Sequence, residues 1–267
     1  MISVAVPTFN STGTLDVCIR SFLETSTRDS EIVIVVDGTL DLNRQLIERY
    51  KGNDKVKFFV LDKNHGMCTA QNIAVKQCRS NRVLVINDDH IFHDGWEEIE
   101  CLYDYNSVVS FRTIEFKECP LFGNTPNDFN FSLFRTFNPV PLNDDNNVIQ
   151  IPFLINKFKY IAIGGFDPGC ENGMKADCDF YLRCRIVGLN MIYSEKTCFY
   201  HFSMTTVNDI NLVRMGKTSR TQSEINSFNY LTGKWGVGRC PSRKNRKFSG
   251  MPFLFSDVVE QEEKIIR

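Results

Sequence analysis

The sequence lacks the paired cysteines that mark small zinc sites and redox motifs. Ten cysteines occur among its 267 residues, but they are scattered and no two form a C-x-x-C pair. Several fall among apolar residues, so we expect free, mostly buried thiols in a reducing cytosol and neither a disulfide framework nor a zinc site. The absence of internal repeats and low-complexity tracts excludes repeat architectures.

An excess of charge of either sign is also missing. The 31 Lys and Arg residues almost balance the 32 Asp and Glu residues, and the formal net charge is -1. This balance excludes a protein that binds nucleic acid through a uniformly basic surface, although a local basic patch remains compatible with it. The composition, 42% hydrophobic and 24% charged, is that of a globular protein.

A long apolar run is missing as well. The longest, "IPFLINKFKYIAIGGF", contains Lys157 and Lys159 and is too short to span a bilayer. The chain opens directly on residues typical of a strand, which predicts that no signal peptide precedes the fold. We therefore expect no transmembrane segment and a cytoplasmic location.

The sequence does contain a regular alternation of apolar strands and amphipathic helices. Runs rich in β-branched residues predict strands, and segments with apolar residues at helical spacing lie between them. Four strands alternating with three helices predict an α/β sheet with parallel strands and right-handed crossovers. The predicted strands are residues 2–9, 31–39, 56–62 and 82–88, and the predicted helices are residues 12–26, 40–51 and 66–80.

Polar residues follow these strands. Asn10, Asp37, Asn64 and the pair Asp88 and Asp89 all stand at or just beyond a strand's carboxyl end, where ligands bind in such sheets. The pair is the most informative, because adjacent carboxylates repel each other and a carboxylate near an apolar core costs free energy unless it is paired. Either the strand has reached water there, or a cation binds.

The alternation ends after residue 105. Residues 117–147 are rich in Asn, Pro and Phe without a clear period, which predicts loops. Elsewhere we expect strands at 107–116 and 189–203, one or two strands and a Gly164–Gly165 turn within 148–167, helices at 175–188 and 219–231, and a basic, turn-rich segment at 239–250.

Seven segments, in this order, resemble the glycosyltransferases of family 2: "VAVPTFN", "IVIVVDGT", "NHGMCTAQN", "VLVINDDH", "GGFD", "ADCDFYLR" and "YHFS". The resemblance covers residues 2–203. It implies a GT-A (Rossmann-like) α/β fold, with a mixed sheet flanked by helices. Residues 1–205 would form this domain, with a nucleotide-sugar half at 1–105 and an acceptor half at 106–205. Residues 206–267 would form a helical and basic C-terminal extension packed on it.

The resemblance implies a hexosyl- or pentosyltransferase that uses a divalent cation and inverts the anomeric centre. The last aspartate of the acidic signature, Asp89, would bind Mn2+ or Mg2+, with His201 as a second ligand, and Asp88 would face the ribose or the sugar. Hard oxygen ligands suit these ions, which neutralise a leaving diphosphate. His90 and His93 form an H-x-x-H pair, but a zinc site needs a further ligand, so we expect both in a loop.

The resemblance also implies a pyrimidine nucleotide-sugar donor. Asp37 would accept the ring N–H that uracil and thymine carry, so the donor would be a UDP-sugar or a dTDP-sugar, with a UDP-sugar preferred. Relatives have Ala-Arg-Asn where this chain has Ala70-Gln71-Asn72, so one expected nucleotide contact is missing. The remaining residues expected at the nucleotide-sugar are Pro7, Thr8, Asn10, Asn64, Gly66 and Asn72.

A hydroxyl acceptor needs a carboxylate base in line with the anomeric carbon. Relatives show Glu-Asp-x-Asp, and this chain has Ala176-Asp177-Cys178-Asp179, so the resemblance implies that Asp177 is the catalytic base. The acid that precedes the base in relatives is absent. For Asp179 we expect the ordinary role of a carboxylate at a helix N-terminus.

The acceptor remains open at this stage. Glycans, lipid-linked sugars and proteins are the dominant acceptors in the family; we expect a glycan or a lipid-linked sugar, and a hydroxymethylated pyrimidine in phage DNA is an alternative. A non-catalytic nucleotide-sugar or carbohydrate binding protein is an alternative of another class. A basic stretch would attract a polyanionic acceptor or form a solvated tail; it contains Lys234, Arg239, Arg243, Lys244, Arg246 and Lys247.

Overall fold

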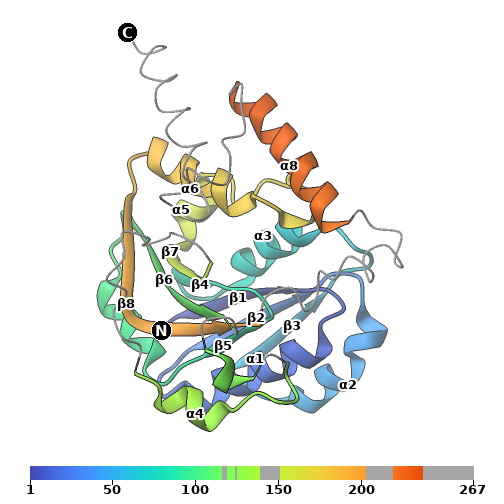
Figure 1. Ribbon diagram of the computed structural model, residues 1–267, viewed down its shortest axis with the longest axis vertical. Helices are drawn as coiled ribbons and strands as arrows, with labels where there is room; N and C mark the ends of the chain where they lie inside the picture. Colours follow the sequence, from blue (N-terminus) through green and yellow to red (C-terminus); the bar gives the residue numbers. More distant parts are fainter. Residues whose placement is uncertain (116–118, 124, 139–150, 203–218, 237–267) are drawn as a thin grey trace.

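One sheet with helices on both faces forms the molecule (Figure 1). The computed structural model describes residues 1–115, 119–123, 125–138, 151–202 and 219–236. Within them the sheet has eight strands in the order β3-β2-β1-β4-β7-β6-β8-β5. The first four, all parallel, confirm the predicted α/β half: β1 (Ser3–Thr8), β2 (Glu31–Val36), β3 (Val56–Val60) and β4 (Arg82–Val85).

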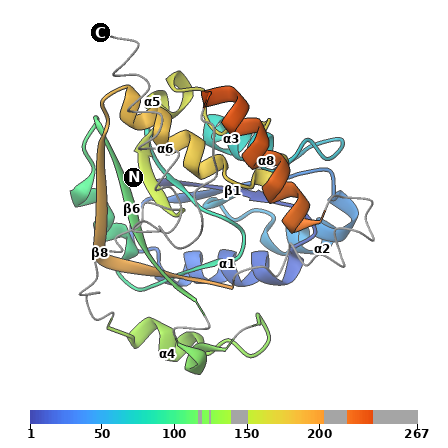
Figure 2. The same cartoon turned by 45° about the horizontal axis from the view of Figure 1, so that its top comes forward.

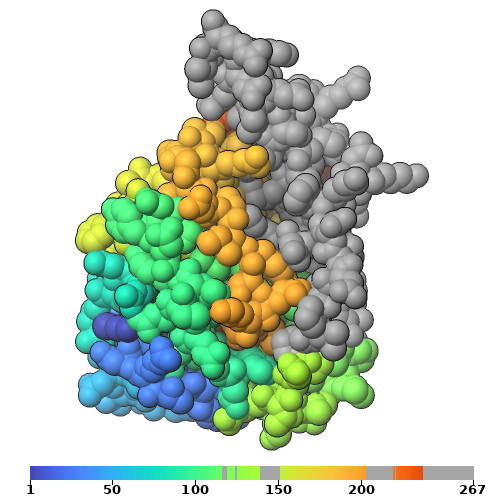
Figure 3. Space-filling view, turned by 90° about the vertical axis from the view of Figure 1, so that its left-hand side faces the viewer, coloured from blue at the N-terminus to red at the C-terminus, as the bar shows by residue number. Residues whose placement is uncertain are grey.

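The second half makes the sheet mixed. β7 (Phe153–Asn156) is antiparallel to both β4 and β6 (Ser107–Glu115), and β6 is parallel to β8 (Asn190–His201). In Figure 3 the surface of β8, in orange, runs beside the green surface of the segment that contains β6. The short strand β5 (His90–Phe92) then pairs antiparallel with the end of β8. The segment after β4 is thereby joined to the last strand.

The strands are apolar on both faces because helices cover both. In β2, Val33 and Val35 belong to one core, with Ala70 and Ala74 of α3, while Ile34 belongs to the other. Such two-sided burial explains the nearly continuous apolar runs of the sequence. The first core contains residues of α3 (Met67–Gln77), α5 (Lys157–Ala162) and α6 (Ala176–Ile186), and the second those of α1 (Thr12–Thr25), α2 (Leu40–Tyr50) and the 3-10 helix η1 (Trp96–Leu102).

A third cluster lies at the far edge of the sheet. It is largely aromatic: Phe122 and Phe134 pack edge-on against Tyr200 of β8. These residues come from the 3-10 helix η2 (Pro120–Phe122) and the short helix α4 (Phe131–Thr136). The prediction of loops throughout 117–147 was therefore wrong for these two segments, and the rest of that range lies partly outside the described residues.

Two other predicted elements differ from the structure. Residues 157–162 form α5, because the Asn156 side chain accepts hydrogen bonds from the backbone N–H groups of Phe158 and Lys159 and so caps a helix. The last described helix, α8 (Arg220–Trp235), continues beyond residue 231 and ends at Gly236 with φ of 67°. The Gly164–Gly165 turn is confirmed, since both residues have positive φ.

The described cysteines agree with the prediction of buried thiols. All nine are free, and seven of them are buried. Cys240 lies outside the described residues, and the inferred redox compartment stays a prediction. Within the described ranges, no helix has both the length and the apolar character needed to cross a membrane.

The helix α8 is attached to α6 through Asp179. This buried carboxylate accepts hydrogen bonds from Arg183 of α6 and from Lys234 Nζ (2.8 Å) and Trp235 Nε1 (2.9 Å) of α8. Lys234 also lies 2.6 Å from Asp167. Figure 2 shows α8 passing on the α3 and α6 side of the sheet. Asp179 is therefore a structural anchor for α8, while the domain boundary at residue 205 stays a prediction.

We expect Asp179→Ala to lower the free energy of unfolding by about 3 kcal/mol, because it leaves two cationic partners without their shared buried carboxylate. Urea unfolding followed by circular dichroism measures the change. Asp41→Ala is the matched control: Asp41 also stands in the first turn of a helix and pairs with an arginine, but its side chain is 94% exposed. It should cost less than about 1 kcal/mol. Equal losses of unfolding free energy in the two variants would show that the buried Asp179 contacts stabilise the fold no more than a surface ion pair does.

Candidate active site

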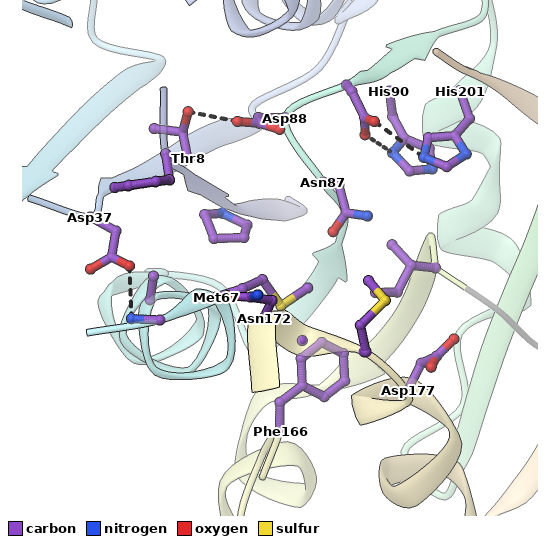
Figure 4. A pocket seen from close by; sticks show the side chains of 18 of the residues that line it. Thr8, Asp37, Met67, Asn87, Asp88, His90, Phe166, Asn172, Asp177 and His201 are labelled. Atoms are coloured by element: carbon purple, nitrogen blue, oxygen red, sulfur yellow. Dashed lines mark hydrogen bonds and ion pairs between the residues drawn. The ribbon is translucent and has the colours of Figure 1, made fainter. Parts of the chain in front are cut away.

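A cavity of about 360 Å³ opens beyond the carboxyl ends of β1, β2 and β4 (Figure 4). Both halves of the chain line it. In Figure 4, Asp88, His90 and His201 lie along one rim and Asp177 along the other. Nine of the eleven site residues expected from the sequence line this cavity: Pro7, Thr8, Asp37, Asn64, Gly66, Asp88, Asp89, Asp177 and His201.

Asp37 fixes the start of α3 against the end of β2. Its carboxylate accepts hydrogen bonds from Asn64 Nδ2 (2.9 Å), the His65 N–H (2.6 Å) and the Gly66 N–H (2.9 Å). The close approach requires Gly38, because a Cβ there would lie 2.3 Å from the Asn64 nitrogen. A carboxylate has about four acceptor positions, so roughly one remains for a ligand.

Thr8 and Asp88 connect the ends of β1 and β4. Thr8 Oγ1 donates a hydrogen bond of 2.6 Å to Asp88 Oδ2. Burial, together with the neighbouring Asp89 carboxylate, raises the pKa of Asp88 to about 7. The two adjacent aspartates therefore have different partners: Asp88 accepts a hydrogen bond from the Thr8 hydroxyl, whereas Asp89 faces the imidazoles of His90 and His201.

Asp89 lies between two histidines from different strands. Its Oδ2 is 3.3 Å from His201 Nε2, and its Oδ1 is 3.4 Å from His90 Nδ1. Burial opposes the charged forms of Asp89 and His201, but their mutual attraction outweighs it, lowering the pKa of Asp89 and raising that of His201 to about 10. Burial, then the His201 charge, lowers the pKa of His90 to about 4. Glu115 Oε1 lies 3.3 Å from His201 Nδ1 and orients that ring.

His90 differs from the sequence expectation. It is the first residue of β5 and 1% exposed, so its assignment to a loop was wrong, whereas His93 does lie in a loop. The sequence contained one signal, the direct adjacency of His90 to Asp89. Its contact with His201 depends on the β5–β8 register, which sequence spacing does not reveal.

Asp177 enters the cavity from the first turn of α6. Burial raises the pKa of this carboxyl above its usual range, although the Cys178 N–H and the nearby Lys175 ammonium oppose the shift. Lys175 also lines the cavity, has the left-handed φ of 64°, and forms an ion pair of 2.9 Å with Glu224 of α8. A buried carboxylate with a raised pKa is suited to accept a proton.

Two of the expected site residues do not line the cavity. Asn72 is bound within the scaffold: its Oδ1 accepts hydrogen bonds from the Phe166 N–H and the Tyr160 hydroxyl, and its Nδ2 donates to Phe166 O. Asn10 has a positive φ of 58° in the loop after β1. Gln71, which replaces the arginine of relatives, is buried and donates to Ala5 O.

Other lining residues were not expected from the sequence. They come from the start of α3, from a 3-10 turn at Glu171–Gly173, from loops and from β6, whose position beside the cavity depends on long-range strand pairing. The main ones are Met67, Thr113, Glu115, Ile151, Phe166, Asn172, Met174 and Lys175. Of these, Met67 and Phe166 stand in two of the segments that resemble the family, and the rest stand in none of them.

Comparison with known sequences gives a family. The model of the family described as "Glycosyl transferase family 2" matches residues 3–147. The GalNAc(5)-diNAcBac-PP-undecaprenol beta-1,3-glucosyltransferase of Campylobacter jejuni is 25% identical over 203 residues, which are 75% of this chain and 62% of that protein. The chondroitin synthase of Escherichia coli is 25% identical over 114 residues, 43% of this chain and 16% of that enzyme. The chain thus spans less than two thirds of these relatives.

Comparison with solved structures gives the fold. S. aureus TarS in complex with UDP-GlcNAc has a TM-score of 0.55 and 17% identity, covering 92% of this chain and 74% of that one. GalNAc-T7 with UDP, GalNAc and Mn2+ has a TM-score of 0.56 and 17% identity, covering 75% of this chain and 43% of that one. The fold is therefore the GT-A fold. The family match ends before Asp177 and His201, so their roles depend on the geometry of the cavity.

Proposed function

The chain belongs to glycosyl transferase family 2, and we propose that it transfers a sugar from a UDP-sugar to a hydroxyl acceptor with inversion at the anomeric carbon. One observation carries the proposal. A single cavity joins a nucleotide-side carboxylate, Asp37, an Asp–His cluster at Asp89 and a carboxylate of raised pKa, Asp177. These are the groups required to hold the donor, stabilise its leaving group and activate a hydroxyl.

Asp37 and Thr8 form the nucleotide end of the cavity. The acceptor position that remains on Asp37 suits the ring N–H of uracil, which thymine shares, so a dTDP-sugar is the second candidate donor. TarS has been solved with UDP-GlcNAc, and this supports a UDP-sugar for the shared fold. The cavity's apolar wall, with Met67 and Phe166, would pack against the donor.

The Asp89 cluster fits a divalent cation. Asp89 Oδ1 and both ring nitrogens of His90 are buried and make no hydrogen bond among the described residues, a costly arrangement unless a ligand binds. We propose that Asp89 and His201 hold Mn2+ or Mg2+. When bound, the ion neutralises charge on the departing diphosphate.

Asp177 acts as the general base in this proposal. It would take the proton of the acceptor hydroxyl as that oxygen attacks the anomeric carbon, and attack from the face opposite the leaving group inverts the configuration. Its raised pKa brings its basicity closer to neutral pH than that of an ordinary aspartate. Ala176 stands beside it in place of the acid that precedes the base in relatives, so Asp177 is the carboxylate of this segment that lines the cavity.

For the acceptor we favour a glycan or a lipid-linked sugar. The name of the C. jejuni relative describes transfer to an undecaprenol-linked saccharide, which supports this class. The alternative of a DNA acceptor was based partly on the basic stretch from residue 234 to 247. Lys234 is engaged by Asp167 and Asp179 and so is not available to a polyanion, and the other basic residues lie outside the described part.

We expect a UDP-sugar to raise the melting temperature more than the matching dTDP-sugar, and Mn2+ to increase the difference. A ligand at 100 times its Kd adds about 2.7 kcal/mol of stability. Thermal unfolding with a panel of both donors, with and without Mn2+, measures this. Equal shifts for the UDP-sugar and the dTDP-sugar would contradict the preference for UDP. UDP release in the presence of a sugar acceptor separates an enzyme from a non-catalytic binding protein.

A further inference from the structure

His90 is the least explained group in the cavity. Its imidazole is 1% exposed, and neither ring nitrogen makes a hydrogen bond among the described residues. A neutral imidazole carries one donor and one acceptor, and leaving such groups unsatisfied in the interior costs about 1–3 kcal/mol each. A residue chosen only to fill this position in the β5–β8 pair would not need to be polar.

The strand register aims His90 and His201 at the same carboxylate. The two residues are paired across β5 and β8, and their rings stack with centroids 4.3 Å apart and an interplanar angle of 18°. One nitrogen of each ring faces one oxygen of Asp89. Figure 4 shows the two rings side by side at the rim of the cavity.

The distances fit shared ligation better than direct hydrogen bonding. The Asp89–His201 and Asp89–His90 separations are 3.3 and 3.4 Å, beyond the usual range of an N–H···O bond. Two ligand atoms that each lie about 2.1 Å from one ion, at angles of about 90–110°, are roughly 3.0–3.4 Å apart. One ligand atom from each of the three residues lies within 4.8 Å of the others.

We propose that His90 is a third protein ligand of the cation, and that it makes the ion resident before the nucleotide arrives. This inference rests on the metal site of the proposed function and extends it. Three protein ligands hold an ion without help from the diphosphate, and positions remain for its oxygens. Two imidazoles also favour a transition-metal ion such as Mn2+ over Mg2+, which prefers all-oxygen surroundings.

The test uses the full chain, MnCl2 and MgCl2, without nucleotide. Free Mn2+ is measured by electron paramagnetic resonance in the wild type and in His90→Phe, which places an aromatic ring at this position but has no ring nitrogen. We expect one bound Mn2+ in the wild type, binding weakened at least about tenfold in His90→Phe, and a smaller preference for Mn2+ over Mg2+. His93→Phe is the matched control, because that loop histidine bonds only to backbone oxygens in the described chain.

Unchanged Mn2+ affinity and unchanged metal preference in His90→Phe would overturn the proposal. If His90→Phe does not fold, nitrogen couplings measured by pulsed resonance on wild-type Mn2+ decide instead: two coordinated imidazoles support the proposal, and one refutes it. Failure of the underlying function looks different. In that case the wild type binds no Mn2+ even with UDP, and Asp89→Ala does not alter metal binding.

Discussion

Asp89→Ala should reduce sugar transfer by about three orders of magnitude or more, the scale of losing charge stabilisation at a leaving group. Asp89 is the carboxylate that both His90 and His201 face, so its loss removes the acidic member of the Asp–His–His group. Donor binding should also lose its response to Mn2+. The measurements are UDP release and the thermal shift by UDP-sugar with and without Mn2+.

The fold should survive this substitution, since Asp89 lies in the turn after β4 and its backbone carbonyl, which accepts a hydrogen bond from the Phe202 N–H, is kept in alanine. Circular dichroism checks that point. Asp94→Ala is the control: this aspartate pairs with Arg135 on the surface just after β5, and its loss should leave activity unchanged. Wild-type transfer that persists in excess chelator would contradict the metal proposal.

Asp177→Asn should lower turnover by roughly two to four orders of magnitude while leaving the affinity for the UDP-sugar nearly constant. The amide keeps the shape of the side chain but cannot accept the acceptor's proton. Single-turnover transfer and donor titration separate the two effects. Asp179→Asn is the comparison: it should destabilise the fold through α8 without this selective loss of turnover. A reversed outcome, or a product that retains the donor's anomeric configuration, would refute the assignment.

The pH profile gives an independent check on Asp177. The base must be ionised, and burial raises its pKa, so activity should fall on the acid side at a pH above the usual aspartate range near 4. The Lys175 ammonium opposes that shift, so Lys175→Met should move the acid limb to still higher pH. A limb that stays in place in this variant would mean that another group titrates.

The parallel half of the sheet could be predicted because its signals are local. Alternate residues of β2 point to opposite faces of the sheet, and those on both faces are apolar, which indicates that both faces are covered. The polar residues that follow the strands mark the edge of the sheet where a ligand would bind. Helix α5 was missed although Asn156 is a good cap, since the apolar run around it also fits a strand.

Side-chain direction and long-range register were not readable in the same way. Asn72 occupies the position of a family motif, yet its amide turns toward Phe166 and Tyr160. His90 stands beside Asp89 in the sequence, but only the antiparallel pairing of β5 with β8 brings it against His201. Residues from β6, such as Glu115, join the cavity through pairings that no short motif encodes.

The attachment of α8 has a practical meaning for anyone who shortens this chain. A fragment that stops at residue 205 would keep every motif that resembles the family. It would also remove Lys234 and Trp235, leaving Asp179 with Arg183 as its one charged partner from α6, and it would release Lys175 at the cavity from Glu224. The stretch that resembles the family is thus shorter than the stretch that holds the cavity rim around Asp177 and Lys175 in shape.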